Sequence, residues 1–92
     1  MIAILPKFSV QQNNTNIYVF HCSAGQGLEK HEHPYSHLTF CTAGSIIVRK
    51  ENLQHIMTKD SQPVNLKAKE WHEIEALEDG TVFINVFAED TF

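Results

Sequence analysis

Three of the six histidines fall within seven residues, in the run His31-Glu-His33-Pro-Tyr-Ser-His37. His31 and His33 are two residues apart, and residues two apart in a β-strand point to the same face. Their imidazole rings can therefore converge on one point, while Glu32 faces the other way. A turn at residues 34–36 would let His37 return toward the same point from the next strand.

This spacing predicts a metal site, because neutral imidazole is the commonest protein metal ligand. His72, on a distant strand, is a candidate fourth ligand. Imidazole suits Zn, Fe, Ni or Cu, suits Mn less well, and poorly suits Mg or Ca. With no carboxylate to offset its charge, a dipositive ion here should hold anionic ligands well and lower the pKa of bound water. A closed tetrahedral zinc site would instead be structural.

The elements that must position these side chains are predicted to be β-strands. Short apolar runs alternate with turn residues at close spacing, which is typical of an all-β sandwich or barrel. The predicted strands cover residues 16–22, 28–33, 37–42, 45–50, 53–58, 64–66, 71–77 and 81–87, with a further first strand within 1–10. Tight turns are expected at 51–52 and 78–80. A helix over 67–77 is the alternative, but the alternation of 71–77 favours a strand.

Length and composition restrict the class of protein. The 92 residues predict one domain over 1–92, with a hydrophobic fraction of 42% and a charged fraction of 20% that are ordinary for globular proteins. The net charge is -4 and the lysines are dispersed, which argues against a nucleic-acid partner. Because so short a chain has a limited core, we expect a homodimer.

The two cysteines, Cys22 and Cys41, bear on the cellular compartment. The first residues lack the basic segment of an export signal, and no run of about 18 apolar residues could span a membrane. We therefore expect a cytoplasmic protein with reduced thiols and no membrane partner. A disulfide between the two cysteines is the alternative.

The glycines around the histidines complete a longer pattern. Five residues separate Gly25 from His31, three separate His33 from His37, and six separate His37 from Gly44. This resembles the first motif of the cupin superfamily, which is glycine, five residues, His-x-His, three or four residues, glutamate, six residues and glycine. His37 stands where the family usually has glutamate.

The second motif of that family ends in a histidine at the start of a late strand, and His72 matches that position. The proline and glycine that usually precede it are absent, since Lys67 and Lys69 stand there, and Ala76 occupies the later asparagine position. The resemblance covers about residues 18–87. It implies a small antiparallel jelly-roll β-barrel that holds a metal ion inside through His31, His33, His37 and His72.

Each histidine also has a simpler interpretation. His31 and His33 could line an exposed strand face, His37 could fill a barrel that has lost its metal, and His72 could be a core or rim residue. His21 and His55 lack a motif and are interpreted as structural or surface residues.

Three further residues are candidates for the pocket. Cys41 and Thr39 share the inward face of the strand with His37, and Tyr35 lies in the turn before it. Cys41 is interpreted first as a small core residue and otherwise as a thiol beside the metal ligands. Tyr35 could contact a substrate or simply pack.

Two functions remain open from the sequence, besides an inert barrel without metal. The first is a metal-dependent dioxygenase, isomerase or lyase that acts on a small anionic or carbonyl compound. The second is a module that binds a metal ion or small molecule, or senses it, without turnover. The fold does not choose among these.

Overall fold

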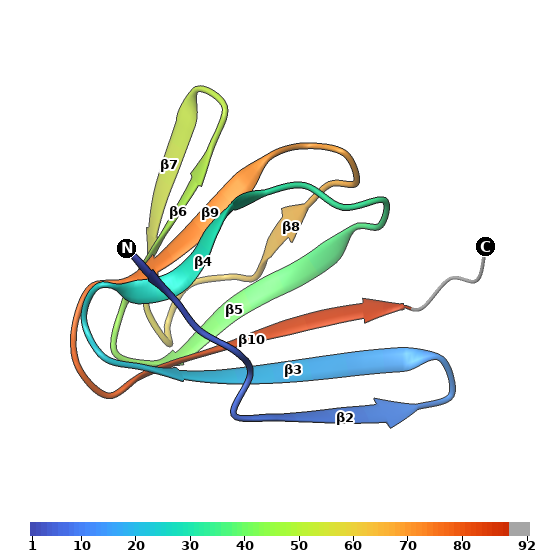
Figure 1. Ribbon diagram of the computed structural model, residues 1–92, viewed down its shortest axis with the longest axis horizontal. Helices are drawn as coiled ribbons and strands as arrows, with labels where there is room; N and C mark the ends of the chain where they lie inside the picture. The colour runs from blue at the N-terminus through green and yellow to red at the C-terminus, as the bar shows by residue number, and fades with distance from the viewer. Residues whose placement is uncertain (89–92) are drawn as a thin grey trace.

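The computed structural model describes residues 1–88, in which ten strands form two five-stranded sheets (Figure 1). The first sheet has the order β1-β4-β9-β6-β7 and the second has the order β2-β3-β10-β5-β8. The strands are β1 (Ile2–Ala3), β2 (Phe8–Gln12), β3 (Thr15–Cys22), β4 (Gln26–His31), β5 (His37–Ala43), β6 (Ile46–Lys50), β7 (Leu53–Met57), β8 (Val64–Leu66), β9 (His72–Ala76) and β10 (Thr81–Ala88).

Alternating side chains explain why these segments form half-buried strands. In β9 the inward residues His72, Ile74 and Ala76 are buried, while the two glutamates between them are partly exposed. β10 follows the same rule, with Phe83 and Asn85 buried. The apolar core lies between the sheets, where Phe20 stacks on Phe83 at a centroid distance of 4.6 Å. This confirms the all-β class.

The predicted closed barrel is not formed by hydrogen bonds within residues 1–88. The edge strands are β1 and β7 in one sheet and β2 and β8 in the other, and these edges do not pair with one another. Because β1 has two residues and β8 has three, these edges are too short to carry a ladder across the seam. β1 also pairs with β4 in parallel, whereas the other strand pairs are antiparallel.

Some strand boundaries differ from the prediction. The first strand expected within residues 1–10 is two separate strands, because Pro6, which lacks an N–H, lies between β1 and β2. The strand expected over 28–33 ends at His31, so His33 lies just beyond it. The strand expected over 71–77 begins at His72, because the chain turns at Lys69, where φ is +64°.

The two glycines of the first motif lie in turns that bring strands together. Gly44 has a φ of +69°, and a Cβ there would collide with the side chain and backbone of Thr81. Gly25 has a φ of +87° and its N–H donates to the carbonyl of Ala76 at 2.9 Å. These turns join β3 to β4 and β5 to β6, and so connect the two sheets.

Across residues 1–88, no helix has the length and apolar character that crossing a membrane would require.

Candidate metal centre

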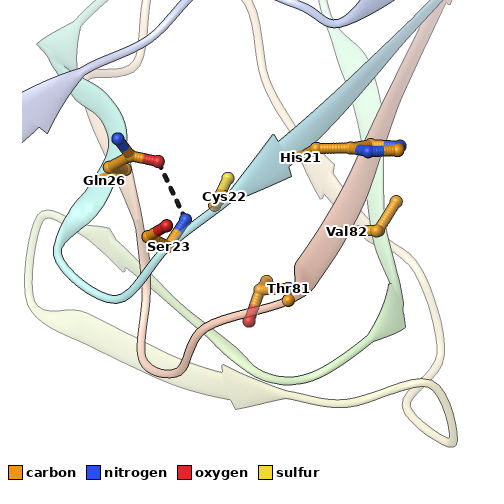
Figure 2. Close-up of a pocket in the computed structure, with 7 residues that line it drawn as sticks. His21, Cys22, Ser23, Gln26, Thr81 and Val82 are labelled. Atoms are coloured by element: carbon orange, nitrogen blue, oxygen red, sulfur yellow. Dashed lines mark hydrogen bonds between the residues drawn. The ribbon is translucent and has the colours of Figure 1, made fainter.

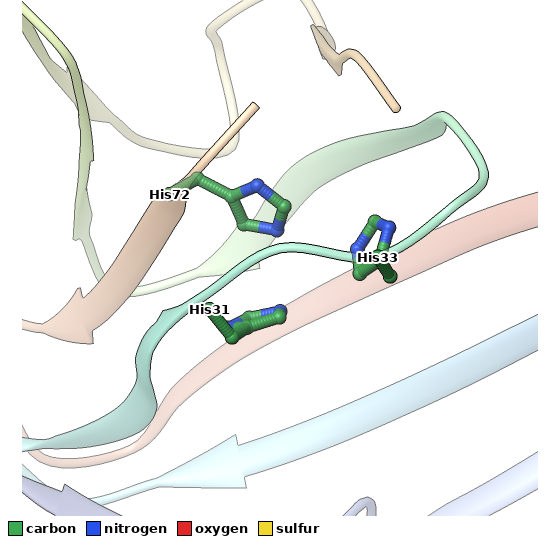
Figure 3. A group of neighbouring side chains, drawn as sticks. All are labelled: His31, His33 and His72. Atoms are coloured by element: carbon green, nitrogen blue, oxygen red, sulfur yellow. The ribbon is translucent and has the colours of Figure 1, made fainter. Parts of the chain in front are cut away.

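Four histidines from the two sheets meet at one end of the space between them. His31 at the end of β4 pairs with His72 at the start of β9, and His33 follows β4 directly. His37 begins β5 in the opposite sheet. Figure 3 shows the rings of His31, His33 and His72 turned toward a common space.

The distances between the rings show that the cluster is tight. One ring nitrogen from each of His31, His33 and His72 lies within 4.8 Å of those of the other two. The Nε2 atom of His37 lies 3.3 Å from the Nε2 atom of His72. His72 is 0% exposed and His37 is 4% exposed, so neither ring has ready access to bulk water.

Three of the four rings use Nδ1 to donate to a backbone carbonyl. His31 donates to Glu29 at 2.6 Å, His33 to Tyr35 at 2.7 Å and His72 to Glu70 at 3.1 Å. A carbonyl oxygen only accepts, so the Nδ1 atom of each neutral ring carries the proton. The lone pair of each ring is therefore on Nε2, as in metal sites where an outer hydrogen bond fixes the tautomer.

His37 is oriented by two buried side chains. Thr39 donates to Asn85 Oδ1 at 2.6 Å, which leaves its oxygen free to accept the Nδ1–H of His37 at 3.0 Å. Thr39 is 0% exposed and Asn85 is 6% exposed. The fourth ring therefore also directs the lone pair of Nε2 into the cluster.

Burial favours the neutral form of His33, His37 and His72. Desolvation, with the nearby rings of His72 and His33, lowers the pKa of His37 to about 3. Desolvation and the neighbouring His31 lower the pKa of His72 to about 4. Desolvation also lowers the pKa of His33. Neutral imidazole is the form that binds a metal ion.

These residues fit a metal ion by their chemistry. With both Nδ1 atoms protonated, the Nε2 lone pairs of His37 and His72 face each other at 3.3 Å in a buried setting with no proton between them. Two such acceptors repel each other, and a cation bound to both would remove the repulsion. A set of imidazole nitrogens suits Zn, Fe, Ni or Cu.

A cavity of about 370 Å³ opens beside the cluster. His31, His33, His37 and Asn85 form its polar part. Its remaining lining residues are apolar or aromatic: Ile4, Leu5, Pro6, Tyr18, Phe20, Leu28, Tyr35 and Phe87. The volume is sufficient for a small molecule.

The sequence suggested Tyr35, Thr39 and Cys41 as pocket residues, and the structure places each of them in different surroundings. Tyr35 lines the cavity and stacks on His33 at a centroid distance of 4.2 Å. Thr39 contacts His37, as described above. Cys41 belongs to the apolar core cluster, and its thiol donates to the carbonyl of Ala43 at 3.2 Å.

A second pocket, of about 290 Å³, lies at the opposite end of β3 and contains His21 and Cys22 (Figure 2). His21 is exposed and contacts the edge of the Phe8 ring at a centroid distance of 6.1 Å. Cys22 is buried in the core. His55 lies on β7 and is partly buried.

No protein-family model and no curated protein matches the sequence. The structure is similar to that of KdgF from a Halomonas species, with a TM-score of 0.79 at 14% identity over 89% of this chain and 76% of that one. It is similar to a cupin superfamily protein from Desulfitobacterium hafniense, with a TM-score of 0.74 at 15% identity over 88% of this chain and 72% of that one. It is also similar to a cupin-2 domain-containing protein from Halorhodospira halophila, with a TM-score of 0.77 at 15% identity over 90% of this chain and 63% of that one.

The chain has the cupin fold. The resemblance found from Gly25, the histidines and Gly44 is thus confirmed at the level of the fold. Within this fold, the cluster of His31, His33 and His72 supports a metal site.

Sequence reasoning missed two parts of this centre. Asn85 is the single inward polar residue between Phe83 and Phe87, and that interruption of an apolar face was a usable signal. The apolar wall formed by residues 4–6 gave no such signal, because only the folded chain brings this segment beside the histidines.

Proposed function

We propose that His31, His33, His37 and His72 bind one divalent transition metal ion through their Nε2 atoms, and that a small anionic or carbonyl compound binds beside it. The observation that carries this proposal is the common orientation of the four rings. Each ring donates its Nδ1–H outward, so each Nε2 lone pair points into the cluster.

The chain and the ion would contribute differently to binding. A bound divalent ion would polarise a carbonyl group or attract an anion as a Lewis acid. The protein holds the imidazoles in fixed directions, and its apolar walls limit the water around the bound compound. Burial, with Tyr18 nearby, raises the pKa of Tyr35, so its hydroxyl stays protonated and can donate a hydrogen bond at neutral pH.

The first candidate function is catalysis, as a dioxygenase, isomerase or lyase that acts on the bound compound. A binding or sensor module without turnover is the second candidate, and one observation favours it. The described residues that line the cavity include no Asp or Glu to act as a general base. Dioxygen uptake and product formation on a panel of carbonyl and carboxylate compounds separate the two.

Metal analysis tests the proposal directly. Protein purified without a histidine tag or added metal should contain about one transition metal ion per chain by elemental analysis. The double variant His31→Ala, His33→Ala should contain almost none. The matched control His21→Ala, His55→Ala should retain the metal. An undiminished metal content in the His31→Ala, His33→Ala variant would contradict the proposed metal site.

We also propose a homodimer through the outward face of the second sheet. Cross-strand register places two rows of apolar side chains on that face. The rows are Phe8, Val19, Ile84 and Phe40, and Val10, Ile17, Val86 and Leu38. Phe8, Val10 and Leu38 are 52%, 50% and 44% exposed. An uncharged face of this kind suits a second copy of itself, related by a two-fold axis.

Light scattering should give a mass near twice the chain mass of 10.5 kDa. Val10→Lys should shift the protein to the monomer, because it places a charge in the apolar face. Ile56→Lys, at a position 68% exposed in the other sheet, should leave the mass unchanged. A monomer for the parent chain at micromolar concentration contradicts this proposal.

We infer a cytoplasmic location without a nucleic-acid partner. The free thiols of Cys22 and Cys41 support a reducing compartment. The net charge of -4 supports the second point. Fractionation of cells that express the chain, and a gel-shift assay with mixed DNA and RNA, test the two inferences.

A further inference from the structure

We propose that the compound bound in the cavity has one anionic or carbonyl head and an uncharged apolar tail, with the head at the histidines and the tail against the apolar wall. This inference rests on the proposed function, because the head is assigned to the metal ion. It adds a restriction on the rest of the molecule, which excludes dicarboxylates and sugar acids as preferred ligands.

The first reason for this inference is that the cavity wall lacks charged side chains. No Asp, Glu, Lys or Arg is among the described residues that line the cavity. A second charged group on the ligand would leave water without finding a counter-charge there, which is costly. The one place for an anion is the histidine end, where a metal ion held by neutral imidazoles keeps its full charge.

The second reason is a row of aromatic rings along the cavity wall. Tyr35 stacks on His33 at 4.2 Å and on Phe87 at 4.6 Å, and Phe87 in turn contacts Tyr18 at 5.1 Å between ring centroids. This row begins at His33, a proposed metal ligand, and all of its members line the cavity. A tail that extends from the metal would lie along these rings and remove apolar surface from water.

The segment before β2 also lines the cavity. Ile4 N–H donates to the carbonyl of Gly27 at 3.0 Å, and Lys7 N–H donates to the carbonyl of Val19 at 2.7 Å. Residues 4–6 therefore cross from β4 in one sheet to β3 in the other, as Figure 1 shows. Leu5 lines the cavity and is nevertheless 86% exposed, which places it at the rim.

Matched carboxylates test the inference on Zn²⁺-loaded protein by calorimetry. Each buried methylene should raise affinity about threefold to fourfold, so hexanoate should bind about tenfold more tightly than butyrate. Adipate has the same number of carbons as hexanoate and a second carboxylate, and it should bind at least tenfold more weakly. Equal or tighter binding of adipate, or no binding of hexanoate, overturns the inference.

Two leucine variants show whether the cavity rim sets this preference. Leu5→Arg should weaken hexanoate and strengthen adipate, so that their affinity ratio falls by severalfold. Leu53→Arg, at a position 50% exposed on β7 and outside the cavity, should leave the ratio unchanged. An unchanged ratio in Leu5→Arg, or an equal change in both variants, counts against the inference.

Zinc content measured on the same samples separates the two proposals. Protein that takes up no zinc under these conditions overturns the proposed metal centre and this inference together. Protein with one zinc ion per chain and no preference for apolar tails overturns this inference alone.

Discussion

Two of the pockets formed by residues 1–88, which lie toward opposite ends of β3, have similar volumes but different chemistry. The cavity of about 370 Å³ has histidines that converge, whereas the pocket of about 290 Å³ has His21 and Cys22, which do not. His21 and Cys22 are consecutive in β3, so their side chains point to opposite faces of the sheet. His31 and His33 are two residues apart and point to the same side.

This difference shows that residue types alone do not make a site. Histidine and cysteine are both metal ligands, but a ligand pair on a strand needs a spacing of two. The histidine end also has an outer layer, in which every Nδ1 atom has an acceptor. If this outer layer distinguishes the two ends, a substitution within it should lower metal affinity, and a substitution outside it should not.

The largest effect is expected from His37, where the chain departs from the family motif. His37→Leu should keep the fold but lower metal affinity at least about tenfold, because it removes a ligand. His37→Glu should still bind metal, with weaker anion binding because of the added negative charge. Calorimetric metal titration measures both, and a leucine variant that binds metal as tightly as the parent contradicts the role of His37.

A smaller effect is expected from Thr39, which holds His37 without being a ligand. Thr39→Val removes the acceptor for the Nδ1–H of His37 and should lower metal affinity about tenfold. Thr42→Val, on the outward face of the same strand, is the matched control and should change nothing. Equal affinities for the two variants, again by calorimetric titration, argue against the positioning role.

Acid should destabilise the metal-free protein. Burial lowers the pKa of His37 to about 3 and that of His72 to about 4, so the folded chain keeps both rings neutral where the unfolded chain binds protons. Stability should be complete above about pH 6.5 and should fall toward pH 4, by up to about 1.4 kcal/mol per pH unit for each ring. Denaturant unfolding between pH 7.5 and 5 measures this slope. His37→Leu should have a shallower slope, and an identical slope would contradict the assignment.

The smallest effect is expected at the second cavity. Burial raises the pKa of Cys22 to about 11, and burial also raises the pKa of Cys41, so neither is a thiolate at neutral pH. A thiol reagent should react slowly with the folded chain and find two free thiols after unfolding. Fast labelling of the folded protein, or no thiols after unfolding, would contradict this expectation.

The histidine cluster was predictable from the sequence because it depends on local geometry. The alternation expected of a strand predicted that His31 and His33 share one side, and the structure brings their rings together although β4 ends at His31. The glycine spacing identified the turns at Gly25 and Gly44. The same alternation predicted most strands to within a few residues. It could not predict that β4 ends before His33, because the hydrogen bonds of neighbouring segments decide where a ladder stops.

Tertiary structure alone decided what surrounds the histidines. Asn85 lies 46 residues from Thr39 in the chain, yet it accepts the hydrogen bond that orients Thr39 toward His37. Residues 4–6 form a cavity wall because their hydrogen bonds attach them to both sheets. The sequence determined which side chains share a face wherever a strand is regular, since backbone geometry sets that. In β4 a register shift between Leu28 and His31 lets both line the cavity although they are three residues apart. Which faces meet, which rings become buried and neutral, and what shape of ligand fits between them depend on how distant strands pack.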